Sequence, residues 1–292
     1  TLLASSAASD VYKRQSVHCS LLEQLDALSQ IGGVCDLSYI KTPALLSRAE
    51  NGKLTDAGNS MSPDIERVMS LNPDAILLSP FENAGYGRIG KMGIPIIECA
   101  DYLETSPLGR AEWIKFFGLL YGKEVEADSI FTEVEKNYTE LRNKIGILSS
   151  APVVISELKS GSAWYMPGGK SYMARFFKDA GAAYPWSDNP ETGSIPLSFE
   201  TVFNWAGEAD IWLIKSFNVS ELSYRTLQKE YAPYARFKAF REKKIYGCDS
   251  SRCNYYEETP FRPDLLLQEL AALFHPGLFP DYRFRYYQPL SE

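Results

Sequence analysis

The chain has 292 residues and a formal net charge of −7, and 45% of its residues are hydrophobic and 13% aromatic. This acidic balance excludes a nucleic-acid-binding protein, which needs a basic surface to neutralise phosphates. The length is sufficient for two α/β domains with separate hydrophobic cores. Because the longest apolar runs, at 75–78 and 211–214, are short, no segment is predicted to span a membrane.

Residues 1–15 differ from the rest of the chain. They are low in sequence complexity, predict no helix or strand, and resemble a translated sequencing adapter. We therefore expect this segment to be non-native, and we expect a signal sequence or lipid anchor, together with the first strand of the fold, to have been lost before residue 16. Loss of an inner strand would expose an unpaired sheet edge.

From residue 16 to residue 106, helical and strand patterns alternate. A helix is predicted at 21–32, ended by the glycine pair at 32–33, and a short helix is predicted at 88–92. Strands are predicted at 34–38, 75–78 and 94–99. This alternation indicates βαβ units and a mainly parallel sheet.

Two long helices follow, at 107–121 and 124–145, and the second contains almost no helix-breaking residues. At 1.5 Å per residue the second helix would span about 33 Å, which is enough to brace two domains. The alternation then returns, with strands at 153–157, 211–214 and 244–248 and helices at 170–180, 224–231, 233–241 and 263–274. The sequence thus predicts an N-terminal lobe at 16–106, connecting helices at 107–149 and a C-terminal lobe at 150–292.

One structural unit occurs twice in the chain. Glu66 and Glu200 each lie in the first turn of an amphipathic helix that leads into a short apolar strand. Helix-start signals, with Asp64 in one copy and Ser198 in the other, precede both glutamates. Matched units indicate two similar lobes, and a cleft between lobes is a common ligand site.

These elements resemble the substrate-binding proteins of ABC importers that carry cobalamin, siderophore-bound iron or haem. The resemblance covers most of the chain from residue 16 to about residue 279. It rests on SPDIERVMSLNPD at 62–74, MGIPII at 92–97, WYMPGGKS at 164–171 and FRP at 261–263. It implies an α/β protein in which a long rigid backbone helix joins two small lobes with mainly parallel sheets, and in which the ligand cleft lies between the lobes.

The resemblance also implies a role for the repeated glutamates. In this family one glutamate on each lobe docks onto arginines of the membrane permease, and by position these are Glu66 and Glu200. Arginine forks suit paired carboxylates of this kind. The alternative is that both glutamates occur only because the helix dipole favours negative charge in the first turn.

Loops that follow the strands are the candidate ligand site, because open parallel sheets bind ligands beyond the carboxyl ends of their strands. Aromatic side chains can stack on a corrin, a porphyrin or an aryl siderophore, and an arginine can pair with an anionic chelate. Each of these residues could equally be a packing residue of its loop. The predicted ligand-binding residues are Tyr39, Phe81, Glu82, Tyr86, Trp164, Tyr165, Phe217, Arg252 and Tyr255.

The two histidines, His18 and His275, are too few for a site that binds free zinc or manganese. His18 is a candidate axial ligand of haem iron, although a supporting position beside the site is the favoured interpretation. Cys248 and Cys253 could form a disulfide in an oxidising compartment or remain buried thiols. No cofactor or metal held by the protein is expected, since a bound chelate would carry its own iron or cobalt.

The sequence therefore predicts a monomeric substrate-binding protein, not an enzyme, in the periplasm or on the outer face of the cytoplasmic membrane. Its expected partners are a metal chelate and an ABC permease with an arginine-bearing periplasmic surface. A ferric siderophore or cobalamin is favoured over haem. Two alternatives stay open: an enzyme that acts on a metal complex on the same two-lobed fold, using Cys248 and Cys253, and an accessory protein that shares the fold but serves no transporter.

Overall fold

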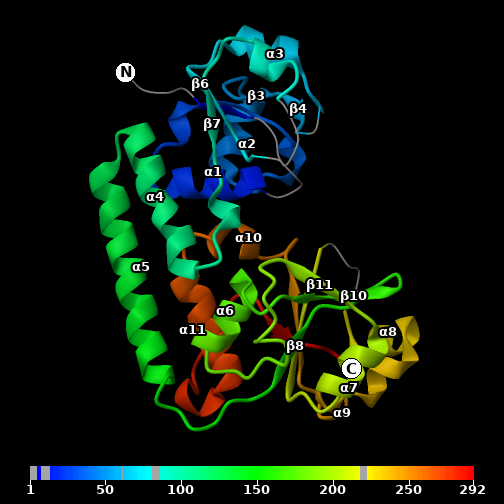
Figure 1. Ribbon diagram of the computed structural model, residues 1–292. Helices are drawn as coiled ribbons and strands as arrows, with labels where there is room; N and C mark the ends of the chain where they lie inside the picture. The colour runs from blue at the N-terminus through cyan, green and yellow to red at the C-terminus, as the bar shows by residue number, and fades with distance from the viewer. Residues whose placement is uncertain (1–4, 8–13, 61, 81–85, 218–221) are drawn as a thin grey trace. The chain divides into compact units, whose positions relative to one another are not determined.

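The computed structural model in Figure 1 describes residues 5–7, 14–60, 62–80, 86–217 and 222–292. The chain divides into two compact units. The N-terminal unit contains residues 1–104, 109–134 and 256–261, and the C-terminal unit contains residues 105–108, 135–255 and 262–292.

The N-terminal unit is built on a parallel sheet, as the alternating pattern predicted. Among its described residues the strand order is β3-β2-β1-β6-β7, and every neighbouring pair is parallel. The buried side chains of β6 come from the apolar run that followed the first glutamate helix. The strands are β1 (Ser5–Ala7), β2 (Ile31–Val34), β3 (Thr55–Asp56), β6 (Ala75–Leu78) and β7 (Ile96–Glu98).

The central strand of this sheet is β1, so the expectation that residues 1–15 form no element is wrong for Ser5–Ala7. β1 pairs with β2 on one side and with β6 on the other. A strand at this position supplies hydrogen-bond partners to backbone groups of β2 and β6 that would otherwise face an empty slot. Composition alone did not reveal this, because serine and alanine carry little strand signal.

The predicted helix at 21–32 is wrong in both its start and its end. Helix α1 spans Arg14–Gln24, and the chain then turns through Asp26, whose φ of 51° is left-handed. Gly32 and Gly33 lie inside β2 and do not end a helix. A Cβ on Gly33 would stand 3.0 Å from the side chain of Leu71, so these glycines allow helix α3 (Ile65–Leu71) to pack closely on the sheet.

The remaining elements of the N-terminal unit are short. Helix α3 follows an antiparallel pair formed by β4 and β5, and the predicted helix at 88–92 is a single 3₁₀ turn, η3. These elements are α2 (Pro43–Glu50), α3 (Ile65–Leu71), β4 (Gly58–Asn59), β5 (Ser62–Pro63), η1 (Leu28–Gln30), η2 (Leu37–Tyr39), η3 (Ile89–Lys91) and η4 (Asp101–Leu103).

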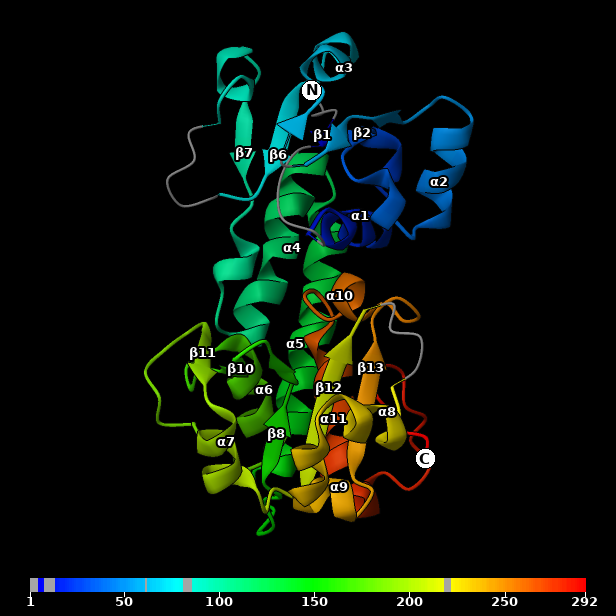
Figure 2. The same cartoon turned by 90° about the vertical axis from the view of Figure 1, so that its right-hand side faces the viewer.

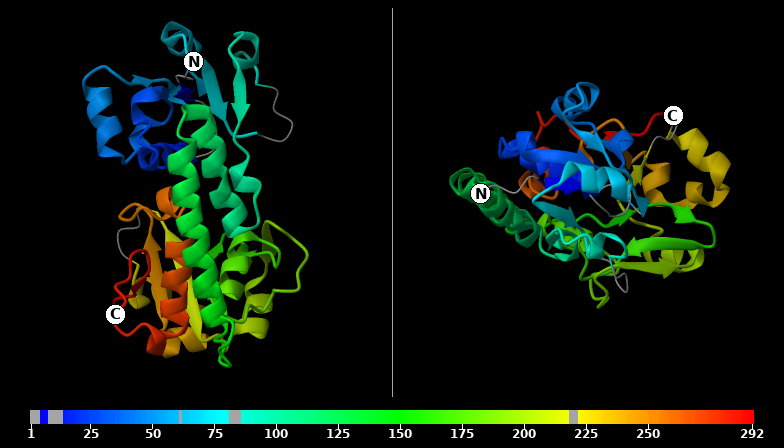
Figure 3. Two further views of the ribbon diagram at one scale, coloured as in Figure 1. Left: turned by 90° about the vertical axis from the view of Figure 1, so that its left-hand side faces the viewer. Right: turned by 90° about the horizontal axis from the view of Figure 1, so that it is seen from above.

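Helices α4 (Pro107–Tyr121) and α5 (Glu124–Ile145) begin and end where the sequence predicted. They lie side by side in Figures 1 and 3, and Lys115 on α4 forms a 3.1 Å ion pair with Asp128 on α5. A Cβ on Gly118 would stand 2.5 Å from the Cβ of Ala127, so glycine allows the two helices to approach. Helix α5 belongs to the N-terminal unit up to Val134 and to the C-terminal unit from Glu135.

The main sheet of the C-terminal unit has the order β14-β13-β12-β8 among the described residues. β12 is parallel to both β8 and β13, whereas β14 is antiparallel to β13. Helices α6 and α11 lie on one face, and α7 and α9 lie on the other (Figures 1 and 2). The elements are β8 (Val154–Ser156), β12 (Ile211–Ser216), β13 (Ile245–Asp249), β14 (Gln288–Pro289), α6 (Tyr172–Asp179), α7 (Phe199–Ala206), α8 (Tyr224–Glu230), α9 (Lys238–Arg241), α10 (Tyr255–Glu258), α11 (Pro263–Phe274), η5 (Ala232–Arg236) and η6 (Pro276–Leu278).

A small antiparallel sheet in this unit was not predicted. It consists of β9 (Lys159–Ser160), β10 (Ala163–Pro167) and β11 (Ser194–Leu197), in the order β11-β10-β9. The helix predicted to start at 170 begins at Tyr172 as α6, because Ser171 caps it by accepting a hydrogen bond from the backbone N–H of Ala174. A Cβ on Gly169 would meet three backbone oxygens at 2.4–2.5 Å, so only glycine fits there.

Candidate functional site

The two glutamate helices have the same local construction. Asp64 caps α3 by accepting hydrogen bonds from the backbone N–H groups of Glu66 and Arg67, both at 3.1 Å. Ser198 caps α7 by accepting a 3.1 Å hydrogen bond from the N–H of Thr201. Each glutamate is therefore the second residue of a capped helix, where the helix dipole favours its negative charge.

Both glutamate side chains are exposed to solvent. Within the part of the chain that the structure describes, neither carboxylate forms an ion pair. Each helix also carries an exposed apolar side chain: Met69 on α3 is 59% exposed and Trp205 on α7 is 68% exposed. A carboxylate and a large apolar side chain on one short helix are the components of a protein-binding surface, in which apolar contacts are surrounded by charged groups.

A hollow of about 440 Å³ lies in the C-terminal unit, where β12 and β13 end. Its wall includes Ser216 at the end of β12, Asp249 at the end of β13, and the two arginines Arg252 and Arg285. This volume is within the range of about 300–1,000 Å³ that small-molecule sites occupy. Of the predicted ligand residues, Arg252 lies in this wall. Sequence reasoning did not select Asp249 or Arg285, because neither belongs to a recognisable motif.

Hydrogen bonds to Asp249 and Ser216 hold the turn that carries Arg252. Asp249 Oδ1 accepts hydrogen bonds from the backbone N–H and the hydroxyl of Ser251, at 3.0 and 2.7 Å. Ser250 donates through its N–H and its hydroxyl to the carbonyl oxygen of Ser216, both at 2.9 Å. The Arg252 side chain is 78% exposed and its Nε lies 3.4 Å from Asp249 Oδ2, so most of its hydrogen-bond donors face solvent.

The structure separates the adjacent candidates Trp164 and Tyr165. Trp164 is 0% exposed, packs against Trp212, Tyr234 and Phe237 at centroid distances of 5.3–5.7 Å, and donates its indole N–H to the carbonyl oxygen of Ser156 at 3.0 Å. Tyr165 is 51% exposed, because successive side chains of β10 point to opposite faces. The prediction of Trp164 as a ligand contact is therefore replaced by a role in the core, and Tyr165 is the side chain that reaches solvent.

The other aromatic candidates differ in exposure. Tyr39 and Phe217 are exposed large side chains, whereas Tyr86 packs against the core cluster that contains Ile89. Tyr255 is buried against Tyr286 and Tyr287, with ring centroids 5.6 and 6.1 Å away, and so serves as packing in this structure. Phe81 and Glu82 lie outside the described residues.

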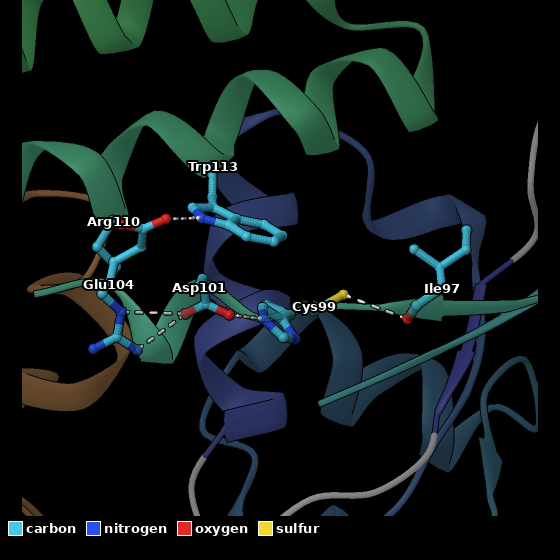
Figure 4. A network of polar contacts seen from close by, with 7 residues as sticks. Ile97, Cys99, Asp101, Glu104, Arg110 and Trp113 are labelled. Atoms are coloured by element: carbon cyan, nitrogen blue, oxygen red, sulfur yellow. Dashed lines mark hydrogen bonds and ion pairs between the residues drawn. The ribbon is translucent and has the colours of Figure 1, made fainter. Parts of the chain in front are cut away.

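His18 belongs to a buried polar network in the N-terminal unit. Its Nε2 lies 3.0 Å from Asp101 Oδ1, and its ring packs against Phe117 at 5.1 Å. Asp101 Oδ2 accepts hydrogen bonds from Nε and Nη2 of Arg110, at 3.2 and 3.1 Å (Figure 4). Burial favours protonation of this carboxyl, but the hydrogen bond and charge of His18 and the charge of Arg110 outweigh it and lower the pKa of Asp101. Because Nε2 already has a partner, His18 does not present it to haem iron in this structure.

Next to this network is a second hollow, of about 460 Å³. Glu98, Glu104 and Glu112 line it together with the aromatic rings of Trp113 and Phe116. The indole N–H of Trp113 donates to Glu104 Oε1 at 3.1 Å (Figure 4). Sequence reasoning did not select these residues, since they are spread over β7, the turn after η4 and helix α4.

Among the described residues, no three histidine, cysteine, aspartate or glutamate side chains lie together in a way that could hold a metal ion. In the same residues we find no helix with the length and apolar character needed to cross a membrane.

This chain matches one protein-family model and is similar to several known proteins. A family model described as periplasmic binding protein matches residues 23–251. An uncharacterized lipoprotein of Methanocaldococcus jannaschii is 31% identical over 239 residues, which make up 78% of this chain and 54% of that protein. The chain thus spans about half the length of this relative.

Two further known proteins are similar to this chain, one over less than half of its length and one over the whole of it. The petrobactin-binding protein YclQ of Bacillus subtilis is 26% identical over 137 residues, which are 46% of this chain and 42% of that protein. The crystal structure of a periplasmic heme-binding protein from Pseudomonas aeruginosa matches with a TM-score of 0.72 and 16% identity, over 100% of this chain and 99% of that chain. At 16% identity this structural likeness shows the shared fold.

Proposed function

Because this chain belongs to the periplasmic binding protein family of ABC importers, we propose that it captures a metal chelate outside the cytoplasm and delivers it to an ABC permease. The chelate is a ferric siderophore or cobalamin in preference to haem. The lipoprotein names of two relatives support the extracytoplasmic location. The similarity to a petrobactin-binding protein supports the choice of a siderophore. Family members bind and transfer substrates and do not convert them, and here the chelate brings its own metal, so the protein needs no cofactor.

The observation that carries the ligand proposal is the hollow at the ends of β12 and β13. Its two arginines, Arg252 and Arg285, suit an anionic chelate, because a guanidinium group pairs with carboxylate oxygens through two parallel hydrogen bonds. We assign direct ligand contact to the exposed members of the predicted set, Tyr39, Tyr165, Phe217 and Arg252. Phe81 and Glu82 remain predictions, and Tyr86 and Tyr255 support the binding loops from beneath.

The observation that carries the docking proposal is the matched pair of exposed first-turn glutamates. Glu66 and Glu200 each lie in the first turn of a capped helix, whose dipole stabilises the carboxylate without neutralising it. Each carboxylate can then accept an arginine fork from the permease. Met69, three residues after Glu66 on α3, would bury apolar surface next to that charge.

Isothermal titration calorimetry tests the ligand proposal. The purified protein is titrated with cyanocobalamin, haem, ferric citrate and ferric hydroxamate and catecholate siderophores, and saturable binding of one chelate is the expected result. Arg252→Ala should weaken that binding about tenfold or more, since a charge-assisted hydrogen bond contributes about 1.5–3 kcal/mol. The matched control is Arg225→Ala, an exposed arginine on α8, which should leave the Kd unchanged. A folded protein that binds no chelate of the panel would refute the proposal.

Charge reversal tests docking separately from ligand binding. Glu66→Arg and Glu200→Arg should each abolish chelate uptake through the partner permease in vesicles while the Kd for the chelate stays the same. Exposed glutamates elsewhere on the two units, Glu50 on α2 and Glu230 on α8, provide the control reversals. Normal uptake by both docking variants would favour an accessory protein that works without a transporter.

A further inference from the structure

Two of the five cysteines lie next to each other, and one of them lines the arginine-bearing hollow. The sulfur atoms of Cys248 and Cys253 are 3.7 Å apart, and Cys253 Sγ also lies 3.4 Å from the carbonyl oxygen of Asp249. Cys248 is fully buried at the end of β13, whereas Cys253 is half-buried and lines the hollow. The other three thiols are buried in the N-terminal unit, where two of them contact backbone carbonyl oxygens.

We propose that Cys248 and Cys253 form a disulfide that closes the turn between β13 and α10 and fixes the arginine-bearing wall of the hollow. The inference rests on the proposed function in one respect, namely that an extracytoplasmic protein meets oxidants that can form such a bond. A disulfide bond is about 2.05 Å long, so the sulfur atoms need to approach by about 1.7 Å. A rotamer change of the half-buried Cys253 side chain can supply this movement without displacing β13.

The bond forms by exchange with a small external disulfide such as oxidised glutathione. The thiolate of Cys253, the accessible member, attacks one sulfur of the external disulfide, and the other sulfur leaves as a thiolate. Cys248 then loses its proton to solvent and its thiolate attacks Cys253 Sγ, which releases the second external thiolate. Two thiols of the protein are oxidised to one disulfide and one external disulfide is reduced to two thiols. Cys253 is the initial nucleophile because the contact with Cys253 and burial raise the pKa of the Cys248 thiol.

The consequence for the hollow follows from the position of Arg252 within the closed segment. Residues 248–253 form the turn, and Arg252 is its most exposed member. At one end, hydrogen bonds from Ser250 to Ser216 tie the turn to β12, and the disulfide would tie its other end to β13. Ordering the turn before the ligand arrives removes an entropy cost from binding.

Mass spectrometry of the full chain tests the bond. The folded protein is treated with oxidised glutathione, denatured, alkylated with iodoacetamide and digested. We expect the fragment that contains 248–253 to be 2 Da lighter than its reduced form and unalkylated, while the other three cysteines are alkylated. Cys253→Ser should leave Cys248 alkylated, and Cys99→Ser, the matched control, should leave the bond intact. Alkylation of all five cysteines in the treated wild type would overturn the proposal.

Hydrogen exchange tests the effect on the turn. The amides of residues 250–253 should exchange more slowly in the oxidised protein than after reduction, and equal exchange would overturn the positioning role. For the chelate of the panel that binds best, reduction should raise the Kd about threefold to tenfold, the range expected from ordering one long side chain and its turn. An unchanged Kd would likewise overturn the positioning role. If no chelate binds at all, mass spectrometry and hydrogen exchange still show whether the disulfide forms and orders the turn. Failure of the disulfide proposal can therefore be distinguished from failure of the proposed function.

Discussion

Replacement of Asp101 by asparagine should strongly destabilise the N-terminal unit. The carboxylate is 2% exposed and bridges the ring of His18 and the guanidinium of Arg110. Asparagine keeps the shape but removes the charge and turns one of the two acceptors into a donor. Removing one partner of a buried ion pair costs about 3–5 kcal/mol, because the other charge stays buried. Arg110 retains 16% exposure and can partly recover water, so we expect a loss of about 3 kcal/mol.

Urea unfolding at pH 7 measures this loss through tryptophan fluorescence, in which Trp113 reports on the N-terminal unit and the other four tryptophans report on the C-terminal unit. The matched control is Glu104→Gln, which alters a half-buried carboxylate bonded to the same tryptophan and should change stability by about 1 kcal/mol or less. Asp101→Asn should leave the unfolding of the C-terminal unit unaltered. A destabilisation by Asp101→Asn below about 1 kcal/mol would refute the assignment of Asp101 as the centre of the network.

The sign of the pH dependence provides an independent check. Because the folded state lowers the pKa of Asp101 below its ordinary value of 3.8, the stability it contributes is fully present above pH 3.8. The contribution is lost as the pH falls through the folded-state pKa. The difference between the wild type and Asp101→Asn should therefore be constant from pH 7 down to about 4 and shrink below it. A difference that grows on acidification would contradict the charge assignment.

Three further predictions concern stability. Glu269→Ala should cost about 4 kcal/mol and speed hydrogen exchange at residues 285–287, because the buried carboxylate accepts three backbone N–H bonds and one tyrosine hydroxyl. Gly169→Ala should lower the melting temperature by at least several degrees, whereas Gly277→Ala, with open space around it, should leave it within about 1–2 °C, as differential scanning calorimetry can show. Trp164→Ala should cost about 3–5 kcal/mol in urea unfolding, whereas Tyr165→Ala should cost less than about 1 kcal/mol and weaken chelate binding.

The parts of the fold that the sequence predicted well are those whose signal is local. Helices α4, α5 and α11 were predicted to the residue, because their apolar stripes run uninterrupted from a proline or acidic start to a glycine or histidine end. The prediction that Gly32 and Gly33 end a helix was wrong because the signal there is not local. There glycine marks the close approach of α3 to β2, a tertiary contact, and not a helix end.

The contrast between local signals and tertiary contacts also explains which candidate ligand residues the sequence predicted. From residue type alone, Trp164 and Tyr165 were equivalent aromatic candidates. Strand β10 directs their side chains to opposite faces of the sheet. Which face belongs to the core is decided only when β10 pairs with β9 and β11. The wall of the hollow depends on where β13, β14 and the turn at 249–253 meet. Positions so far apart in the chain share no sequence pattern, so Arg285 gave no signal.

The proposed docking surface and the proposed ligand site therefore depend on different kinds of information in the sequence. The placement of Glu66 or Glu200 needs only one capped helix, and the exposure of each carboxylate follows from the amphipathic stripe that buries the opposite face. A docking surface of this kind can be conserved in geometry while the loops that meet the ligand vary freely. Variants of the loops, such as Arg252→Ala, should then weaken chelate binding without altering recognition of the permease. Variants of the helix starts should do the reverse, and this separation is the property expected of a carrier that presents different cargoes to one kind of transporter.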